Sequence, residues 1–153
     1  MKKILFICHG NICRSPMAEF VMKDLVRKAH LENAIYISSA ATSTEELGND
    51  IHHGTRKKLL QKNVPFEKRQ ARQTTRADYE EYDYIVVMDE NNIRNLRRII
   101  GVDKDKKVFK LLDFTDRKGE SIADPWYTGD FDLTYEDVLE GCNGLLEFLK
   151  KRL

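Results

Sequence analysis

Short apolar runs alternate with longer amphipathic stretches along the chain. Ile4–Ile7 is apolar at every position, and so is Tyr84–Met88 within the segment Asp83–Met88. Uninterrupted apolar runs of this length are typical of strands that are covered on both faces. Two runs that include polar residues, at Ala34–Ser38 and Lys107–Lys110, predict two further strands. The pattern therefore predicts about four strands.

Apolar positions three or four residues apart predict the helices between these strands. In the first helix, Met17 and Val21 share one face, and in the last an apolar stripe runs from Val138 to Leu153. Gly141 and Gly144 weaken that last helix by about 1 kcal/mol each relative to alanine, which packing must offset. The predicted helices are Pro16 to about Ala29, His52–Gln61, Glu90–Ile100 and Thr134–Leu153.

Strands that alternate with helices predict an α/β fold. We expect residues 1–153 to form a single domain, with a twisted parallel sheet of about four strands and helices on both faces. Ala40–Asn49 and Leu112–Asp132 lack a period and are expected to be loops. In such folds the ligand binds at the carboxyl ends of the strands, where Cys8 and Asp89 lie.

Composition and charge exclude several classes of partner. The chain has 26 Lys and Arg against 25 Asp and Glu, a net charge of only +1, which does not favour binding of nucleic acid. No apolar stretch approaches the roughly 20 residues that cross a bilayer, so no membrane association is expected. Three cysteines without a disulfide framework predict a reducing compartment, and hence a cytoplasmic protein.

The segment between the first strand and the first helix has the chemistry of an anion site. Ser15 and Pro16 are read as the N-cap and first residue of the helix, whose N-terminus favours negative charge. The same field favours a thiolate at Cys8, and Arg14 offers a planar fork that pairs with phosphate oxygens. The loop between them is His9, Gly10, Asn11, Ile12 and Cys13.

The run Cys8 to Pro16 resembles the phosphate-binding loop of the low-molecular-weight protein tyrosine phosphatases. Three later segments also resemble that family, in the same order and spacing across nearly the whole chain. A bare pair of cysteine and arginine at this spacing is a weak signal, but four ordered segments are a strong one. The three later segments are 39–43 (SAATS), 88–92 (MDENN) and 124–127 (DPWY).

The resemblance implies a hydrolysis through a phosphocysteine intermediate. Cys8 would be the nucleophile, Arg14 would bind the transition state, and Asp124 would be the general acid and then the base. Ser15 would donate a hydrogen bond to the sulfur. Asn11, a residue that tolerates left-handed backbone, would hold the loop in shape through Ser39.

The resemblance also implies features around the pocket. Trp126 and Tyr127 would wall it and stack on the substrate ring. Cys13 would form a reversible disulfide with Cys8, whereas Cys142 is expected to be buried and inert. No metal or cofactor is implied. The four histidines have no ligand-like companions and are expected to be solvated or structural: His9, His30, His52 and His53.

Two positions depart from the pattern of many relatives. Glu45 stands where many carry an aromatic residue, at the mouth of the site, and a carboxylate there should repel acidic substrate flanks. Arg69 stands where some carry histidine, and we expect it to form an ion pair with Glu19 that braces the loop.

The resemblance leaves other functions open. Protein-arginine phosphatases share the scaffold but have threonine at the position of Ile12, and thioredoxin-linked arsenate reductases need two more cysteines, which residues 39–122 lack. A non-catalytic phosphoprotein-binding module would lack the nucleophile or the acid. We therefore expect phosphotyrosine-containing proteins or peptides as partners. The protein would be a monomer or a weak homodimer.

Overall fold

A four-stranded parallel sheet forms the centre of this computed structural model, which describes all 153 residues. Its spatial order is β2-β1-β3-β4, so β1 is paired on both sides, with Cys8 opposite Ala41 and Ile7 opposite Val87. Four strands were expected, and the α/β class is confirmed. The strands are β1 (Lys2–Cys8), β2 (Ile35–Ala41), β3 (Tyr84–Val87) and β4 (Val108–Lys110).

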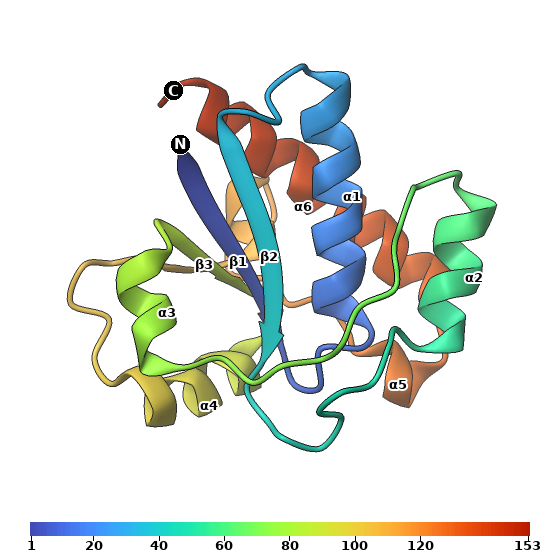
Figure 1. The fold of residues 1–153 in the computed structure, drawn as a ribbon, viewed down its shortest axis with the longest axis horizontal. Helices are drawn as coiled ribbons and strands as arrows, with labels where there is room; N and C mark the ends of the chain where they lie inside the picture. The colour runs from blue at the N-terminus through green and yellow to red at the C-terminus, as the bar shows by residue number, and fades with distance from the viewer.

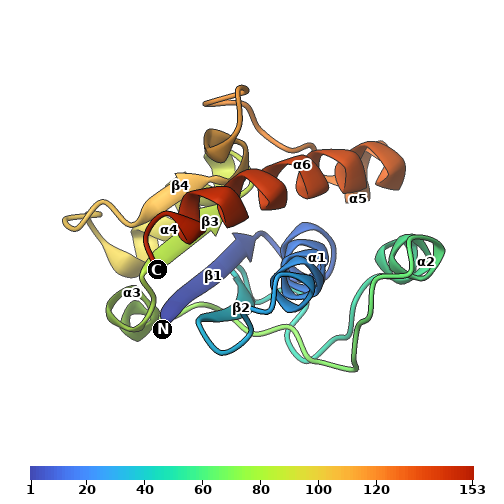
Figure 2. The same ribbon diagram turned by 90° about the horizontal axis from the view of Figure 1, so that it is seen from above.

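Helices cover both faces of this sheet (Figures 1 and 2). Three helices lie on one face and two on the other, while one four-residue helix lies at the carboxyl ends of the strands. On the first face are α1 (Arg14–Lys28), α2 (His53–Gln61) and α6 (Phe131–Lys150). On the second face are α3 (Arg76–Glu81) and α4 (Glu90–Ile100), and α5 (Pro125–Thr128) lies at the carboxyl ends of the strands. A 3₁₀ turn, η1 (Leu111–Phe114), follows β4.

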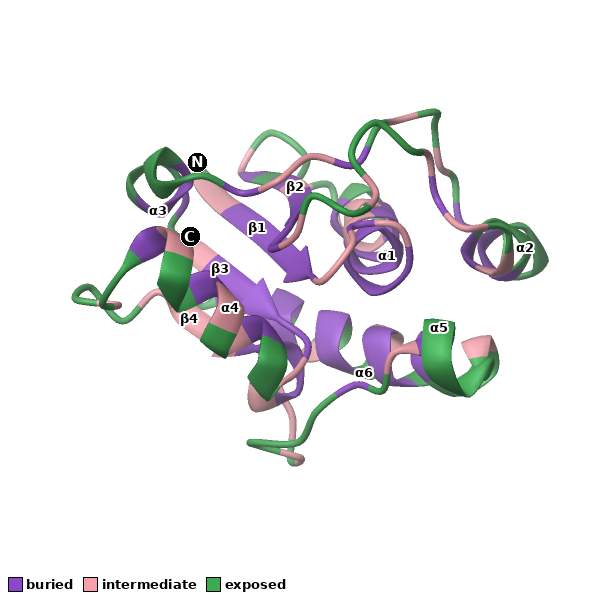
Figure 3. Cartoon of the chain, turned by 90° about the horizontal axis from the view of Figure 1, so that it is seen from below, coloured by how far each residue is buried: buried purple, intermediate pink, exposed green.

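Alternating side chains of β1 supply two separate cores. Ile4, Phe6 and Cys8 belong to the cluster beneath α1 and α6, whereas Leu5 and Ile7 belong to a smaller cluster beneath α3 and α4. All five are buried, as expected for a central strand with both faces covered. Figure 3 shows the buried strands and the exposed surface of α5.

The last helix lies closer to its neighbours than an ordinary helix would. A Cβ at Gly141 would come within 2.4 Å of Leu111, and one at Gly144 within 2.1 Å of the Phe114 carbonyl oxygen. The packing that must offset these two glycines is therefore the close approach of η1. The stripe from Val138 to Leu149 is buried, but Leu153 is exposed because α6 ends at Lys150.

Several boundaries differ from those expected. The β2 strand extends to Ala41, into the expected loop, and the expected loop over 112–132 contains part of η1, all of α5 and the start of α6. The α3 helix was not expected at all. Short helices of this kind depend on their caps and on tertiary packing more than on a hydrophobic period. No helix of the chain is both long and apolar enough to cross a membrane.

Candidate active site

The loop that connects β1 to α1 wraps around the Cys8 side chain. Cys8 Sγ lies 3.0 Å from Ser15 Oγ and accepts a hydrogen bond from the Asn11 N–H at 3.3 Å. Ser15 Oγ also accepts from Asn11 Nδ2 at 2.8 Å, which leaves the Ser15 hydroxyl hydrogen free to point at the sulfur. Both contacts stabilise negative charge on Cys8.

Asn11 is the centre of the hydrogen-bond network behind the loop. It is fully buried and has φ 60°, the left-handed conformation that asparagine tolerates. Its Nδ2 donates to Ser39 Oγ at 2.9 Å, as the resemblance implied, and its Oδ1 accepts from the Arg72 N–H at 3.3 Å. The loop is thus held from β2 and from the segment that precedes α3.

Arg69 braces this loop in a way that differs from the expected ion pair. Its guanidinium donates to the Asn11 carbonyl oxygen at 2.6 Å, to Asn11 Oδ1 and to the Asn49 carbonyl oxygen. The expected pair with Glu19 is absent, because Glu19 binds Ser39 Oγ and Lys23 Nζ instead. Burial lowers the pKa of Arg69, against the charge of Glu19. The expectation of a brace was correct, but its partner was wrong.

The start of α1 also differs from the expectation. The helix begins at Arg14 with Cys13 as its N-cap, and no side chain caps it. Ser15 cannot serve as the cap because its hydroxyl is engaged with Cys8 and Asn11. Pro16 falls in the first turn, where its missing N–H costs nothing. The uncapped N–H groups of that turn remain available to an anion.

Arg14 is buried beside the sulfur and is held by residues from distant parts of the chain. Its Nη1 donates to Asp89 Oδ2 at 2.6 Å and to the Ile122 carbonyl oxygen at 2.8 Å, and its Nη2 lies 3.4 Å from Asp124 Oδ2. Burial works to lower the pKa of Arg14, but the charges of Cys8, Asp89 and Asp124 raise it. The guanidinium is therefore charged, and its buried Nε has no hydrogen-bond partner in the protein.

Asp124 lies at the N-cap of α5, in the loop after β4 and η1. Its Oδ1 accepts from the Trp126 N–H at 3.0 Å, while Oδ2 faces Arg14. The Ile122 N–H donates to the Met88 carbonyl oxygen at 2.9 Å and joins this loop to the end of β3. Trp126 and Tyr127 are 56% and 81% exposed. The loop therefore presents a carboxylate to a charged arginine while its aromatic side chains face solvent.

A pocket opens between the two loops above the sulfur. Its mouth is acidic, since Glu45 and Glu46 both line it, and Glu45 Oε2 lies 2.8 Å from His9 Nε2. Burial, followed by the charge of Cys8, raises the pKa of Cys13 to about 12, so this second thiol stays protonated. The lining residues are Cys8, His9, Gly10, Ile12, Cys13, Glu45, Glu46, Asp124, Trp126 and Tyr127.

The structure brings together every residue that the sequence proposed for the site. Ser39 and Asn11 lie behind the loop, Arg14 is buried and faces Asp124, Ser15 contacts the sulfur, and the others line the pocket. Sequence reasoning missed Glu46 in the pocket and the Ile122 carbonyl oxygen on Arg14. It placed Asp89 at the end of a strand and in a segment that resembles the family, but assigned it no role. No group of three or more His, Cys, Asp or Glu side chains is placed to hold a metal ion.

The fold and this arrangement are those of an α/β protein that binds an oxyanion at the carboxyl end of a parallel sheet. The family model described as low molecular weight phosphotyrosine protein phosphatase matches residues 3–153. The chain belongs to this family, and the curated relatives named below are protein-tyrosine-phosphatases and therefore hydrolases. The expected family is confirmed.

Named relatives agree with the family model. YfkJ of Bacillus subtilis, a low molecular weight protein-tyrosine-phosphatase, is 38% identical over 99% of this chain and 97% of its own. Its crystal structure has a TM-score of 0.95 at 37% identity, over 99% of this chain and 96% of that one. PtpA of Staphylococcus aureus is 35% identical over 99% of this chain and 96% of its own. The Drosophila arginine phosphatase structure has a TM-score of 0.86 at 30% identity, over 98% of each chain.

Proposed function

We propose that this protein hydrolyses phosphotyrosine in proteins or peptides through a phosphocysteine intermediate. One observation carries the proposal: the buried guanidinium of Arg14 lies beside Cys8 with an unpartnered Nε and is held in place by Asp89 and Ile122. A buried donor without a partner is costly unless a ligand satisfies it. A phosphoryl oxygen in the loop would accept from it.

The first step transfers the phosphoryl group to sulfur. The Cys8 thiolate attacks phosphorus, an S–P bond forms, and the P–O bond to the phenol breaks as Asp124 gives its proton to the departing oxygen. Arg14 and the N–H groups of the loop stabilise the charge on the equatorial oxygens.

The second step releases inorganic phosphate. The Asp124 carboxylate takes a proton from a water molecule that attacks phosphorus, and the S–P bond breaks to restore the thiolate. Ser15 supports Cys8 as nucleophile and as leaving group, since its hydroxyl lies 3.0 Å from the sulfur.

The pocket favours an aryl phosphate over phosphoarginine. Ile12, Trp126 and Tyr127 offer apolar and aromatic surface to a phenyl ring. An arginine side chain needs hydrogen-bond partners, which Ile12 does not supply. Arginine phosphatase activity remains the second candidate because a structure with that name is similar to this chain.

Phosphate release from three peptides that differ only in the phosphorylated residue tests the proposal. We expect turnover of phosphotyrosine, with little turnover of phosphoarginine or phosphoserine. Cys8→Ser should abolish turnover, and Asp124→Ala should lower kcat by about 10²-fold or more. Asp116→Ala, a substitution of an exposed aspartate away from the pocket, should match the parent.

Each alternative gives a different result in that assay. Preference for phosphoarginine would keep the chemistry and overturn the substrate. Peptide binding without turnover of any substrate would leave a non-catalytic phosphoprotein-binding module.

We also propose that oxidation of the site is reversible. Peroxide would convert the Cys8 thiolate to a sulfenic acid, and the Cys13 thiol would then displace water to form a disulfide. Both thiols line one pocket, which supports this pairing. Inactivation by peroxide should be reversed by dithiothreitol in the parent but not in Cys13→Ser. Equal recovery of both proteins would contradict it.

The cellular setting is also a proposal. Cys8, Cys13 and Cys142 are all free and buried, which fits a reducing cytoplasm. We propose that the protein acts there as a monomer or weak homodimer on phosphotyrosine-containing proteins, without binding nucleic acid or membranes.

A further inference from the structure

His52 contacts both the phosphate loop and the Asp124 loop. It is the N-cap of α2, and its backbone N–H donates to the Ile12 carbonyl oxygen at 2.9 Å. Its Nδ1 accepts from the Gly54 N–H at 3.0 Å, so this nitrogen carries no proton. The residue is thus anchored to the phosphate loop by its backbone, and its ring is oriented by the start of α2.

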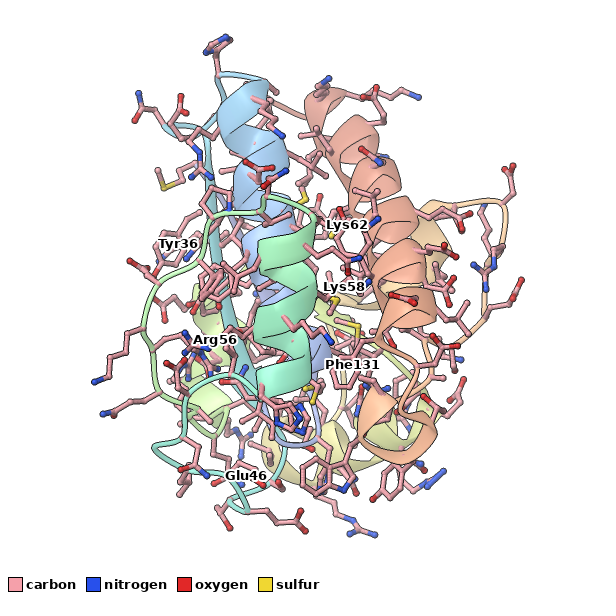
Figure 4. All side chains as sticks on the ribbon, turned by 90° about the vertical axis from the view of Figure 1, so that its right-hand side faces the viewer. Tyr36, Glu46, Arg56, Lys58, Lys62 and Phe131 are labelled. Atoms are coloured by element: carbon pink, nitrogen blue, oxygen red, sulfur yellow. The ribbon has the colours of Figure 1, made fainter.

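The ring of His52 is the middle of a stack of three rings. His53 stacks on it at a centroid distance of 4.2 Å and Phe131 at 5.4 Å, with interplanar angles of 29° and 15°. Gly54 leaves the space that Phe131 occupies, since a Cβ there would come within 2.4 Å of the Phe131 ring. Figure 4 shows Phe131 between α2 and the start of α6. Lys58 of α2 pairs with Asp132, which fastens the two helices beside the stack.

Trp126 packs its ring against this stack at nearly a right angle. The centroids of His52 and Trp126 are 5.5 Å apart, with an interplanar angle of 77°, an edge-to-face arrangement that aromatic rings favour. The Trp126 N–H donates to Asp124 Oδ1. The donor is the backbone N–H of Trp126, so a shift of this residue after loss of its ring contact would also move the Asp124 carboxylate. Because Trp126 is 56% exposed, few other contacts hold it.

We propose that His52 is a positioning residue that holds the Asp124 loop in register with the phosphate loop during proton transfer. The inference rests on the proposed function, because it assigns His52 to the step in which Asp124 protonates the departing phenol. The His52 ring does not line the pocket, so binding of the phosphoryl group does not depend on the ring. Loss of its ring should slow proton transfer and leave oxyanion binding unchanged.

The matched substitution is His52→Asn. An asparagine oxygen can still accept from the Gly54 N–H and cap α2, but the ring that contacts Trp126 is lost. His30→Asn is the control, since His30 is an exposed histidine with φ 60°, which asparagine also tolerates. Asp124→Ala gives the loss of kcat/KM that is expected when the general acid is absent.

Two aryl phosphates separate proton transfer from other defects. Phenolate is a poor leaving group and needs the acid, whereas the more acidic 4-nitrophenol leaves with little help. We expect His52→Asn to lower kcat/KM about tenfold for phenyl phosphate and by less than about threefold for 4-nitrophenyl phosphate. Inhibition by inorganic phosphate should stay within about twofold of the parent. Equal losses on both substrates, or none, would overturn the proposal.

Trp126 supplies a readout that does not require activity, because it is the only tryptophan in the chain. Burial and then the charge of His53 lower the pKa of His52, while Glu46 and Asp124 oppose this shift. The ring is therefore neutral at pH 7. Its protonation at a pH below its ordinary value near 6.5 should appear as a step in Trp126 fluorescence. That step should disappear in His52→Asn and persist in His30→Asn and His53→Asn.

The two measurements distinguish failure of the proposal from failure of the proposed function. A parent protein that hydrolyses neither aryl phosphate would contradict the phosphatase activity, and the fluorescence titration would still decide whether His52 holds Trp126. A fluorescence step that survives in His52→Asn would overturn the positioning role, even in a fully active enzyme.

Discussion

The two loops that form the pocket are held in opposite ways. The back of the phosphate loop is buried, and one residue there, Asn11, connects it to Ser39, Arg69 and Arg72. The Asp124 loop carries Trp126 and Tyr127 on the surface and depends on a few contacts. A phosphoryl group has one shape, so its binding groups can be fixed in advance. The acid must approach substrates of differing size, and a lightly held loop permits this.

The largest expected effect on activity is at Arg14, where the phosphate loop ends and α1 begins. Arg14→Lys keeps one positive charge but loses the planar fork that Asp89 and Ile122 orient. We expect kcat/KM for a phosphotyrosyl peptide to fall about 10²–10³-fold. Arg94→Lys, on the exposed side of α4, is the control and should match the parent. A loss below tenfold at Arg14 would show that charge alone suffices.

Asn11→Ala should destabilise the fold more than any change in the Asp124 loop. It leaves several buried groups without partners, at about 1 kcal/mol each, and adds the strain of a left-handed alanine. We expect the free energy of unfolding to fall by about 2–4 kcal/mol in urea titrations. Asn63→Ala is the control, because Asn63 has φ 57° but is exposed, and it should cost only about 1 kcal/mol. Equal costs would mean that the network contributes nothing.

The ion pair between Arg72 and Asp78, which lies behind the phosphate loop, should weaken in acid. Asp78 accepts from Arg72 Nη1 at 3.0 Å and from the Thr75 N–H at 2.8 Å. Burial works to raise the pKa of Asp78, but these bonds and Thr74 lower it. A lowered pKa stabilises the fold above the unfolded value near 3.9, and this stabilisation is lost as the pH falls through the folded value.

Asp78→Asn tests that dependence. We expect it to cost about 2 kcal/mol of unfolding free energy at pH 7, from the loss of a half-buried charged pair. The difference from the parent should be constant above about pH 5 and shrink towards pH 3. Asp116→Asn should show neither the cost nor the pH dependence. A difference that does not change with pH would assign the cost to packing rather than charge.

A double-mutant cycle measures how strongly the hydrogen bond between Arg69 and Asn11 stabilises the fold. Asn11→Ala combined with Arg69→Gln should give a coupling of about 1–2 kcal/mol in unfolding free energy, because the two side chains are hydrogen-bonded. Glu19→Gln combined with Arg69→Gln should give less than about 0.5 kcal/mol. A larger coupling between Glu19 and Arg69 than between Asn11 and Arg69 would support the Glu19–Arg69 ion pair that the sequence predicted.

The smallest effect is expected in the Asp124 loop, at an exposed side chain. Tyr127→Ala removes a side chain that is 81% exposed, so unfolding free energy should change by less than about 0.5 kcal/mol. Its ring lines the pocket, so KM for a phosphotyrosyl peptide should rise about two- to fivefold while kcat stays constant. Tyr36→Ala, on the remote edge strand, should leave KM unchanged. A fall in kcat at Tyr127 would mean that the loop is less tolerant than proposed.

Periodic and apolar patterns predicted the elements that form the core. Runs such as Ile4–Ile7 and the helix Glu90–Ile100 stand out because burial selects their side chains. The sequence did not predict α3, whose six residues depend on a capping box between Thr75 and Asp78. It also placed the start of α6 at Thr134, although Asp130 caps the helix and Phe131 begins it.

The site was predictable where a motif is contiguous. Cys8 and Arg14 follow from one segment, and the resemblance supplied Asp124. The partner of Arg69 and the role of His52 depend on contacts between segments that approach only in the folded chain, some 40–75 residues apart in the sequence. For His52 the available signal was its position at the start of a predicted helix. It is the N-cap of α2, whereas the predicted helix His52–Gln61 included it as the first residue.

The partners of Arg14 come from Asp89, Ile122 and Asp124, which lie 75 to 110 residues further along the chain. During synthesis the ribosome adds roughly 5–20 residues per second, so the nucleophilic loop precedes its partners by several seconds. Cys8 and Arg14 therefore leave the ribosome as an ordinary thiol and an ordinary surface cation. The anion site forms only after the last third of the chain has followed, so an incomplete chain carries the motif without the enzyme.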